Sequence, residues 1–131
     1  MSLTTLHGIK VLVVDDNDAV REVLTEILTH LGATVTAEAS ADLGLATLMR
    51  ERPDVLLSDI AMPDHDGIWL ITQVRRLPAN EGGETPAAAL TGNVFAEHRA
   101  TILRAGFQYH IPKPVSAAQL AGVVALLALK P

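Results

Sequence analysis

The sequence contains no cysteine among its 131 residues. A chain without thiols has no disulfide framework, no cysteine-ligated zinc or iron–sulfur centre and no thiol nucleophile. The same absence fits a reducing cytoplasm, which is the location we expect. Aromatic residues make up only 3% of the chain, so aliphatic side chains must build the core.

Long apolar segments and basic runs are missing as well. The longest stretch without a charged residue, 114–129, has sixteen residues, whereas a membrane-spanning helix needs about 20. The formal charge is −5, from ten basic and fifteen acidic residues, and no basic stripe is available for a phosphate backbone. We therefore expect neither membrane insertion nor direct binding of nucleic acid.

What remains is the composition of one globular domain. Apolar residues are 49% and charged residues 19% of a chain of ordinary domain length. No repeat or linker divides it. We expect a single domain over residues 8–129, with residues 1–7 as a disordered or cloning-derived N-terminus.

Short apolar runs alternate along the chain with amphipathic stretches, which predicts alternating strands and helices. Asp18, Ser40 and Ser116 are expected to cap the first, second and last helices. The alternation predicts an α/β fold with an open parallel sheet and helices on both faces. The expected strands are 9–14, 34–38 (near an edge), 54–58, 86–90 and 107–111, and the expected helices are 18–31, 40–53, 68–77, 94–105 and 116–129.

Ligands of such sheets bind beyond the carboxyl ends of the strands. The polar residues expected there are Asp15, Asp16, Asp59, Thr91 and Lys113. Converging carboxylates repel one another, and a hard divalent cation with oxygen ligands removes that cost. The pattern therefore predicts a Mg²⁺ site.

A phosphoryl-transfer site is the chemistry that these strand ends favour. A cation, the Lys113 ammonium and the Thr91 hydroxyl together can hold the oxygens of a transferring phosphoryl group. Asp59, alone at the end of its strand, is then the candidate nucleophile that forms an acyl phosphate. Taken singly, each residue is equally explained as a turn, cap or loop residue, so the prediction depends on the whole set.

The segment Asp64-His65-Asp66 also has the residue types of a ligand cluster. Pro63 and Gly67 on either side favour a solvated turn instead. No Walker loop, GxGxxG sequence or GxSxG elbow is present, so nucleotide binding and serine hydrolysis have no support.

Four motifs in order, VVDDN at 13–17, SDIAMPDHDG at 58–67, ALTG at 89–92 and PKP at 112–114, resemble the receiver domain of two-component response regulators. The resemblance implies a flavodoxin-like five-stranded sheet with strand order 2-1-3-4-5. It also implies that a phosphohistidine on a histidine kinase or a histidine phosphotransfer domain donates the phosphoryl group.

The resemblance assigns a role to each site residue. Asp59 is the phosphoacceptor, and Asp15 and Asp16 hold Mg²⁺ with it, Asp16 more directly. Ala61 contributes its backbone carbonyl to the metal. Thr91 and Lys113 contact the phosphoryl group and report its arrival.

Two positions depart from the family pattern. His110 stands where members usually carry Tyr or Phe, three residues before the lysine. It is the candidate to replace the aromatic switch that acts with Thr91, and the alternative is a partly buried histidine that only fills space. Gly92 replaces the usual Ala after Thr91. The segment 105–115 is similar to receivers fused to sensor histidine kinases, which makes a hybrid kinase the expected context.

Other functions stay open at this point. The alternatives to a hybrid kinase context are a stand-alone response regulator and a degenerate receiver that only docks, and the complete set of site residues argues against the degenerate receiver. An aspartyl-phosphate hydrolase of similar topology needs a second Asp two residues after the nucleophile, and that position is Ala61. We therefore expect a signalling domain that promotes only its own phosphorylation and dephosphorylation.

The last helix is apolar on two sides. Its sheet-facing residues are expected to be Leu120, Val123, Val124 and Leu127. The opposite side carries Ala118, Gly122, Ala125, Leu126 and Leu129, which predicts contact with a second copy or a neighbouring domain. The alternative is an Ala-rich helix with tolerated surface leucines.

Overall fold

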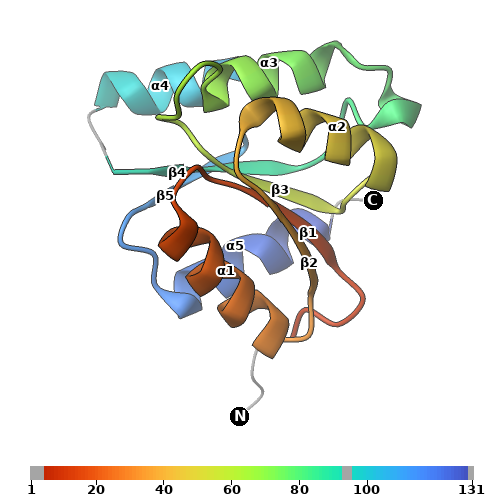
Figure 1. The fold of residues 1–131 in the computed structure, drawn as a ribbon, viewed down its shortest axis with the longest axis vertical. Coiled ribbons are helices and arrows are strands. Elements are labelled where there is room, and N and C mark those ends of the chain that lie inside the picture. Colours follow the sequence, from red (N-terminus) through yellow and green to blue (C-terminus); the bar gives the residue numbers. More distant parts are fainter. Residues whose placement is uncertain (1–4, 93–95, 130–131) are drawn as a thin grey trace.

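The computed structural model describes residues 5–92 and 96–129, without the side chains of 96–98. All five strands are parallel and form one sheet in the order β2-β1-β3-β4-β5, with helices on both faces (Figure 1). This confirms the expected flavodoxin-like α/β fold. The strands are β1 (Lys10–Val14), β2 (Thr34–Glu38), β3 (Val55–Asp59), β4 (Ala87–Thr91) and β5 (Tyr109–Pro112). The helices are α1 (Asp18–His30), α2 (Ala41–Glu51), α3 (Gly67–Arg76), the short 3₁₀ helix η1 (Ala79–Glu81), α4 (Ala96–Ala105) and α5 (Ala117–Ala128).

The sheet separates two hydrophobic layers. Helices α1 and α5 cover one face, and α2, α3 and α4 cover the other (Figure 1). Because successive strand residues point to opposite faces, the inner strands contribute side chains to both hydrophobic layers. Every residue of β3 and β4 is buried. Strand β2 lies at an edge and is only partly buried, as its more polar sequence predicts.

The N-terminal caps correct one expectation. Asn17, not Asp18, caps α1: its backbone is extended, and its side-chain oxygen accepts a hydrogen bond from the amide of Val20. Asp18 is the first helical residue and pairs with Arg21 instead. Both residue types are good caps, and only the backbone conformation decides between them. Ser40 and Ser116 cap α2 and α5 as expected.

The start of β5 is a second correction. The strand begins at Tyr109 rather than at 107, because its pairing with β4 begins where Tyr109 meets Ala88. Phe107 instead belongs to the turn after α4, where its amide donates to the carbonyl of Ile102. The expected start of the preceding helix at Val94 lies outside the described residues.

The N-terminal boundary also moves. Leu6 is fully buried in the layer under α1 and α5, and its amide donates to the carbonyl of Leu31 at 2.8 Å. The packed chain therefore begins before residue 8. Among the described residues, no helix is both long and apolar enough to span a membrane.

Candidate functional site

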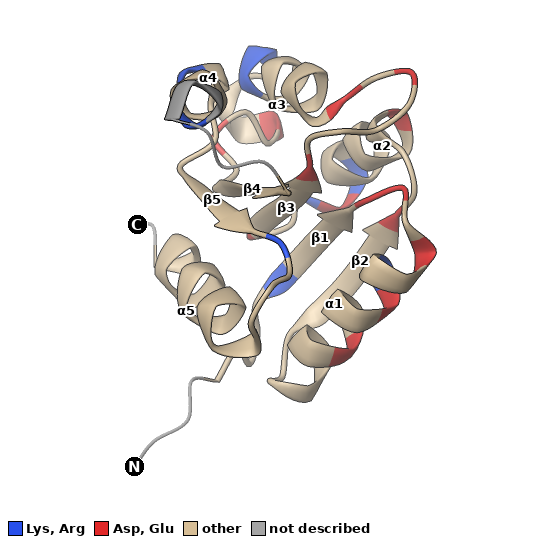
Figure 2. Ribbon diagram, turned by 90° about the vertical axis from the view of Figure 1, so that its left-hand side faces the viewer, with Lys and Arg blue, Asp and Glu red and all other residues tan. Residues whose placement is uncertain are grey.

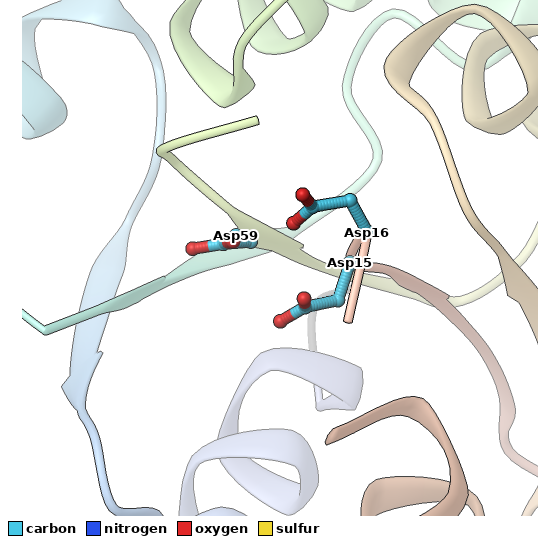
Figure 3. Close-up of side chains that lie close together, drawn as sticks. All are labelled: Asp15, Asp16 and Asp59. Carbon is cyan, nitrogen blue, oxygen red and sulfur yellow. The ribbon is translucent and has the colours of Figure 1, made fainter. Parts of the chain in front are cut away.

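Three carboxylates meet at the carboxyl edge of the sheet. Strands β1 and β3 are neighbours, and Val14 is in register with Ser58, so the residues that follow emerge side by side. Oxygen atoms of Asp15, Asp16 and Asp59 lie within 4.8 Å of one another (Figure 3). The strand order thus brings together the residues that were expected to hold a metal.

The members of this acidic cluster differ in exposure. Asp15 is fully buried and Asp59 is 7% exposed, whereas Asp16 is exposed. Asp15 is also held by the chain itself, since its Oδ1 accepts the amide of Asn17 at 2.9 Å. Asp16 is therefore the carboxylate best placed to reach a cation that keeps part of its water shell, which is how Mg²⁺ is usually bound.

Lys113 supplies the positive charge of the site. Its Nζ lies 3.1 Å from Oδ2 of Asp15 and 3.3 Å from Oδ1 of Asp59. Burial by itself lowers the pKa of Lys113, but the hydrogen bond and charge of Asp15 and the charge of Asp59 outweigh it and raise that pKa above its ordinary value. The ammonium therefore stays charged while it bridges two carboxylates.

The surroundings of Asp59 destabilise the ionised form of its side chain. Burial first, and then the charge of Asp15, raise the pKa of Asp59 above its ordinary value, although Lys113 and the amide of Ile60 offset part of this. That amide donates to Oδ1 at 2.9 Å. An anion held in this way gains from any further cation that enters the site.

Gly67 allows α3 to begin in close contact with the end of β3. A Cβ at this position would lie 2.2 Å from the carbonyl oxygen of Asp59. Only glycine lets the first turn of α3 pass this close to the end of β3.

Thr91 and Ala61 lie at the carboxyl ends of β4 and β3, respectively. Thr91 ends β4, is 7% exposed, and its carbonyl accepts the amide of Lys113 at 2.8 Å. Ala61 comes two residues after β3 and is exposed. Both residues therefore sit at the expected edge of the sheet.

His110 lies away from the acidic cluster. It is half-buried on β5 and pairs with Ala89, whose side chain belongs to the layer under α2, α3 and α4. Its Nδ1 is buried and has no hydrogen-bond partner among the described residues. Burial, and then the charge of Arg99, lower the pKa of His110.

Arg21 is a residue of the site that the sequence analysis did not single out. Its guanidinium donates to the backbone carbonyl of Asp15 at 2.7 Å and also pairs with Asp18. The spacing of Arg21 from Asp18 is a signal for the ion pair alone. The contact with Asp15 depends on where α1 packs against β1.

Comparisons with known proteins agree with this geometry. The sequence profile of the response regulator receiver domain matches residues 11–125, and the chain belongs to this family. It is a receiver domain of two-component signalling, and receiver domains interact with histidine kinases or phosphotransfer partners.

Three similar proteins illustrate the range of the family. The chain is 42% identical over 122 residues to an uncharacterised 14.6 kDa protein of Leptolyngbya boryana, covering 93% of this chain and 92% of that protein. It is 31% identical to hybrid signal transduction histidine kinase D of Dictyostelium discoideum, covering 93% of this chain but only 8% of the kinase. The crystal structure of the receiver domain of sensor histidine kinase PA1611 from Pseudomonas aeruginosa matches with a TM-score of 0.85 at 28% identity, covering 94% and 99% of the two chains, and it contains a magnesium ion in the active site cleft.

Proposed function

We propose that this receiver accepts a phosphoryl group on Asp59 in a reaction that requires Mg²⁺. The observation that carries the proposal is the acidic cluster within 4.8 Å, bridged by one ammonium at 3.1 and 3.3 Å. Three carboxylates and one ammonium leave an excess of negative charge that an anionic phosphoryl donor must overcome. Oxygen ligands at this spacing fit a magnesium ion, which when bound would neutralise that excess and polarise the phosphoryl oxygens.

The residues divide the work of transfer. A carboxylate oxygen of Asp59 attacks phosphorus, the P–N bond of a phosphohistidine breaks, and an acyl phosphate forms as the donor imidazole leaves. Asp15, Asp16 and the carbonyl of Ala61 are the remaining ligands that we assign to the metal. Lys113 holds the phosphoryl oxygens as negative charge shifts onto them.

The switch is assigned to Thr91 and His110. A phosphoryl group on Asp59 offers new acceptors for the Thr91 hydroxyl. His110 lies on β5, the strand beside β4, where it pairs with Ala89, two residues before Thr91. We propose that the two side chains move together when Asp59 is phosphorylated.

The same transfer chemistry indicates the phosphoryl donor and the setting in which the domain acts. We assign the donor to a histidine kinase or a histidine phosphotransfer domain, and the site of action to the cytoplasm, where ATP supplies phosphohistidine. Residues 8–129 together with Leu6 are the functional unit. A hybrid sensor kinase is supported by the kinase relatives, and a single-domain regulator by the relative of similar length.

A hydrolase acting on other phosphoesters is the weaker candidate. Such an enzyme needs a general acid two residues after the nucleophile, and Ala61 has no titratable side chain. We therefore restrict the chemistry of the site to its own phosphorylation and dephosphorylation.

We also propose that the outer side of α5 is a contact surface. The α5 ribbon carries no charged residue (Figure 2). Leu126 is 50% and Leu129 is 76% exposed, and Ala118 and Gly122 are exposed beside them, while Ala125 is half-buried. A second copy of this chain or a neighbouring domain is the partner that we assign to this surface.

Incubation with acetyl phosphate, followed by intact mass spectrometry, tests the central proposal. Wild type should gain one phosphoryl group with Mg²⁺ and none with a chelator, and Asp59→Asn should gain none. Asp54→Asn, which alters a carboxylate at the opposite edge of the sheet beside Lys10, is the matched control. Equal labelling of Asp59→Asn and wild type would assign the chemistry to another residue.

A further inference from the structure

The loop between β3 and α3, residues 60–66, is fastened at both ends and also to a second helix. At the ends, the amide of Gly67 donates to the carbonyl of Ile60 at 2.9 Å, and Asp66 accepts the amide of Trp69 at 2.8 Å. Next to Asp66, His65 Nδ1 lies 2.9 Å from Oδ1 of Asp42. Asp42 belongs to the first turn of α2, so this bond joins the loop to a different helix.

The ring of His65 is also stacked on an indole. The centroids of His65 and Trp69 are 3.8 Å apart, with the planes inclined by 6°. Trp69 in turn packs against the layer under α2, α3 and α4. The segment is exposed, as a solvated turn should be, but its imidazole is held by a carboxylate at its edge and an indole at its face. We call these three side chains the loop latch.

The loop matters because it contains Ala61. A backbone carbonyl has no side-chain torsion with which to adjust, so its position is set by the conformation of the whole loop. A contact that fixes the α3 end of the loop therefore also restricts where this carbonyl can lie.

We infer that His65 is a positioning residue for the magnesium site. By joining the loop to Asp42 and Trp69, it holds residues 60–66 in the conformation that presents the carbonyl of Ala61 to the metal. The inference rests on the proposed function, because it concerns the same site. His65 acts through the loop and touches neither the metal nor the phosphoryl group.

The expected effect is small, because the pair is exposed. The side chains of His65 and Asp42 are 45% and 62% exposed, and exposed polar pairs of this kind change equilibria by about twofold to fivefold. We expect His65→Ala to weaken Mg²⁺ binding by that factor.

Calorimetric titration with Mg²⁺ tests this on wild type, His65→Ala and Asp42→Asn. His30→Ala removes an exposed imidazole at the end of α1 and should bind as wild type does. His65→Phe keeps a ring on Trp69 but loses the bond to Asp42, so it should restore part of the affinity. Trp69 is the single tryptophan, so its emission reports the stack directly and should change in His65→Ala.

Two negative results are distinguishable. If wild type binds Mg²⁺ and becomes phosphorylated, but His65→Ala binds Mg²⁺ equally well, the inference about His65 is wrong and the proposed function stands. If wild type neither binds Mg²⁺ nor accepts a phosphoryl group, the proposed function is wrong and the role of the latch is overturned with it.

Discussion

The ammonium of Lys113 lies 3.3 Å from Oδ1 of Asp59, although the two residues come from strands that are not neighbours. Strand β4 separates β3, which ends at Asp59, from β5, which ends just before Lys113. The long side chain of Lys113 spans this gap from the end of β5 to the end of β3. The proposed nucleophile therefore has a fixed cation beside it, in addition to any metal held by the acidic cluster.

Replacing Lys113 should separate metal binding from transfer. Lys113→Ala removes a charge that interacts with the phosphoryl group and leaves the three carboxylates in place. We expect the Mg²⁺ affinity to stay within about threefold of wild type, and the rate of phosphorylation to fall about tenfold to a hundredfold. Calorimetry and a time course of labelling measure the two quantities.

Lys10→Ala is the matched control for this variant, because Lys10 lies at the other edge of the sheet and donates to the carbonyl of Glu51. It should change neither quantity. Complete loss of Mg²⁺ binding in Lys113→Ala would contradict the assigned role.

The raised pKa of Asp59 predicts a stability effect. A carboxyl whose pKa is higher in the folded than in the unfolded state stabilises the fold below the unfolded value, and this contribution is lost as pH rises through the folded value. At neutral pH the ionised Asp59 is therefore destabilising, and Asp59→Asn should raise the Tm by about 2–5 °C in a chelator. Magnesium should narrow the difference, because it stabilises wild type by binding. An unchanged or lower Tm in the chelator would contradict the direction of the shift.

Arg75 should matter for stability and not for the site. Its guanidinium donates to the carbonyls of Gly106, Gly83 and Thr85 at 2.8–3.1 Å, joining α3 to two loops. Arg75→Met leaves these carbonyls without their donor and should cost about 2–4 kcal/mol of unfolding free energy. Chemical denaturation measures this, with the exposed neighbour variant Arg76→Met as control. A loss of Mg²⁺ affinity in a folded Arg75→Met would show that the effect is not confined to stability.

His110 should sense phosphorylation if it replaces the aromatic switch. Burial and the charge of Arg99 lower its pKa, and a movement of the ring changes both. We expect the pKa of His110, measured by NMR titration, to differ between the free and the phosphorylated protein. Identical pKa values of His110 in the two forms would show that it only fills space and does not act as a switch.

The outer side of α5 should mediate association. Leu126→Glu and Leu129→Glu place charges on an exposed apolar surface, so the fold and the phosphorylation of Asp59 should be preserved while self-association falls. Sedimentation velocity at high concentration measures this. Leu43→Glu, at a 53% exposed leucine on α2, is the control. A wild type that stays monomeric, together with variants that bind kinase and output domains normally, would contradict the assignment.

The fold class and the composition of the site were predictable from local patterns. Short apolar runs ending in Asp15, Asp59 and Thr91 predict parallel strands, and parallel strands place their ends at one edge. Their convergence also requires the strand order, which places β1 beside β3 and β3 beside β4 and which only the resemblance to receiver domains predicted. The predictions for the N-terminal cap of α1 and for the start of β5 were wrong. The cap depends on the backbone conformation of a single residue, and the start of the strand depends on its pairing with β4.

The sequence by itself determined the alternation of strands and helices and the residues at the strand ends, since both are encoded by neighbours along the chain. Only the tertiary structure decided the contacts among distant residues: Lys113 with Asp15 and Asp59, Arg21 with the carbonyl of Asp15, and His65 with Asp42. Such contacts depend on how helices pack on the sheet and on which long side chains span the gaps between strands. A shift of about 1 Å in that packing makes or breaks a hydrogen bond, and no local pattern encodes it.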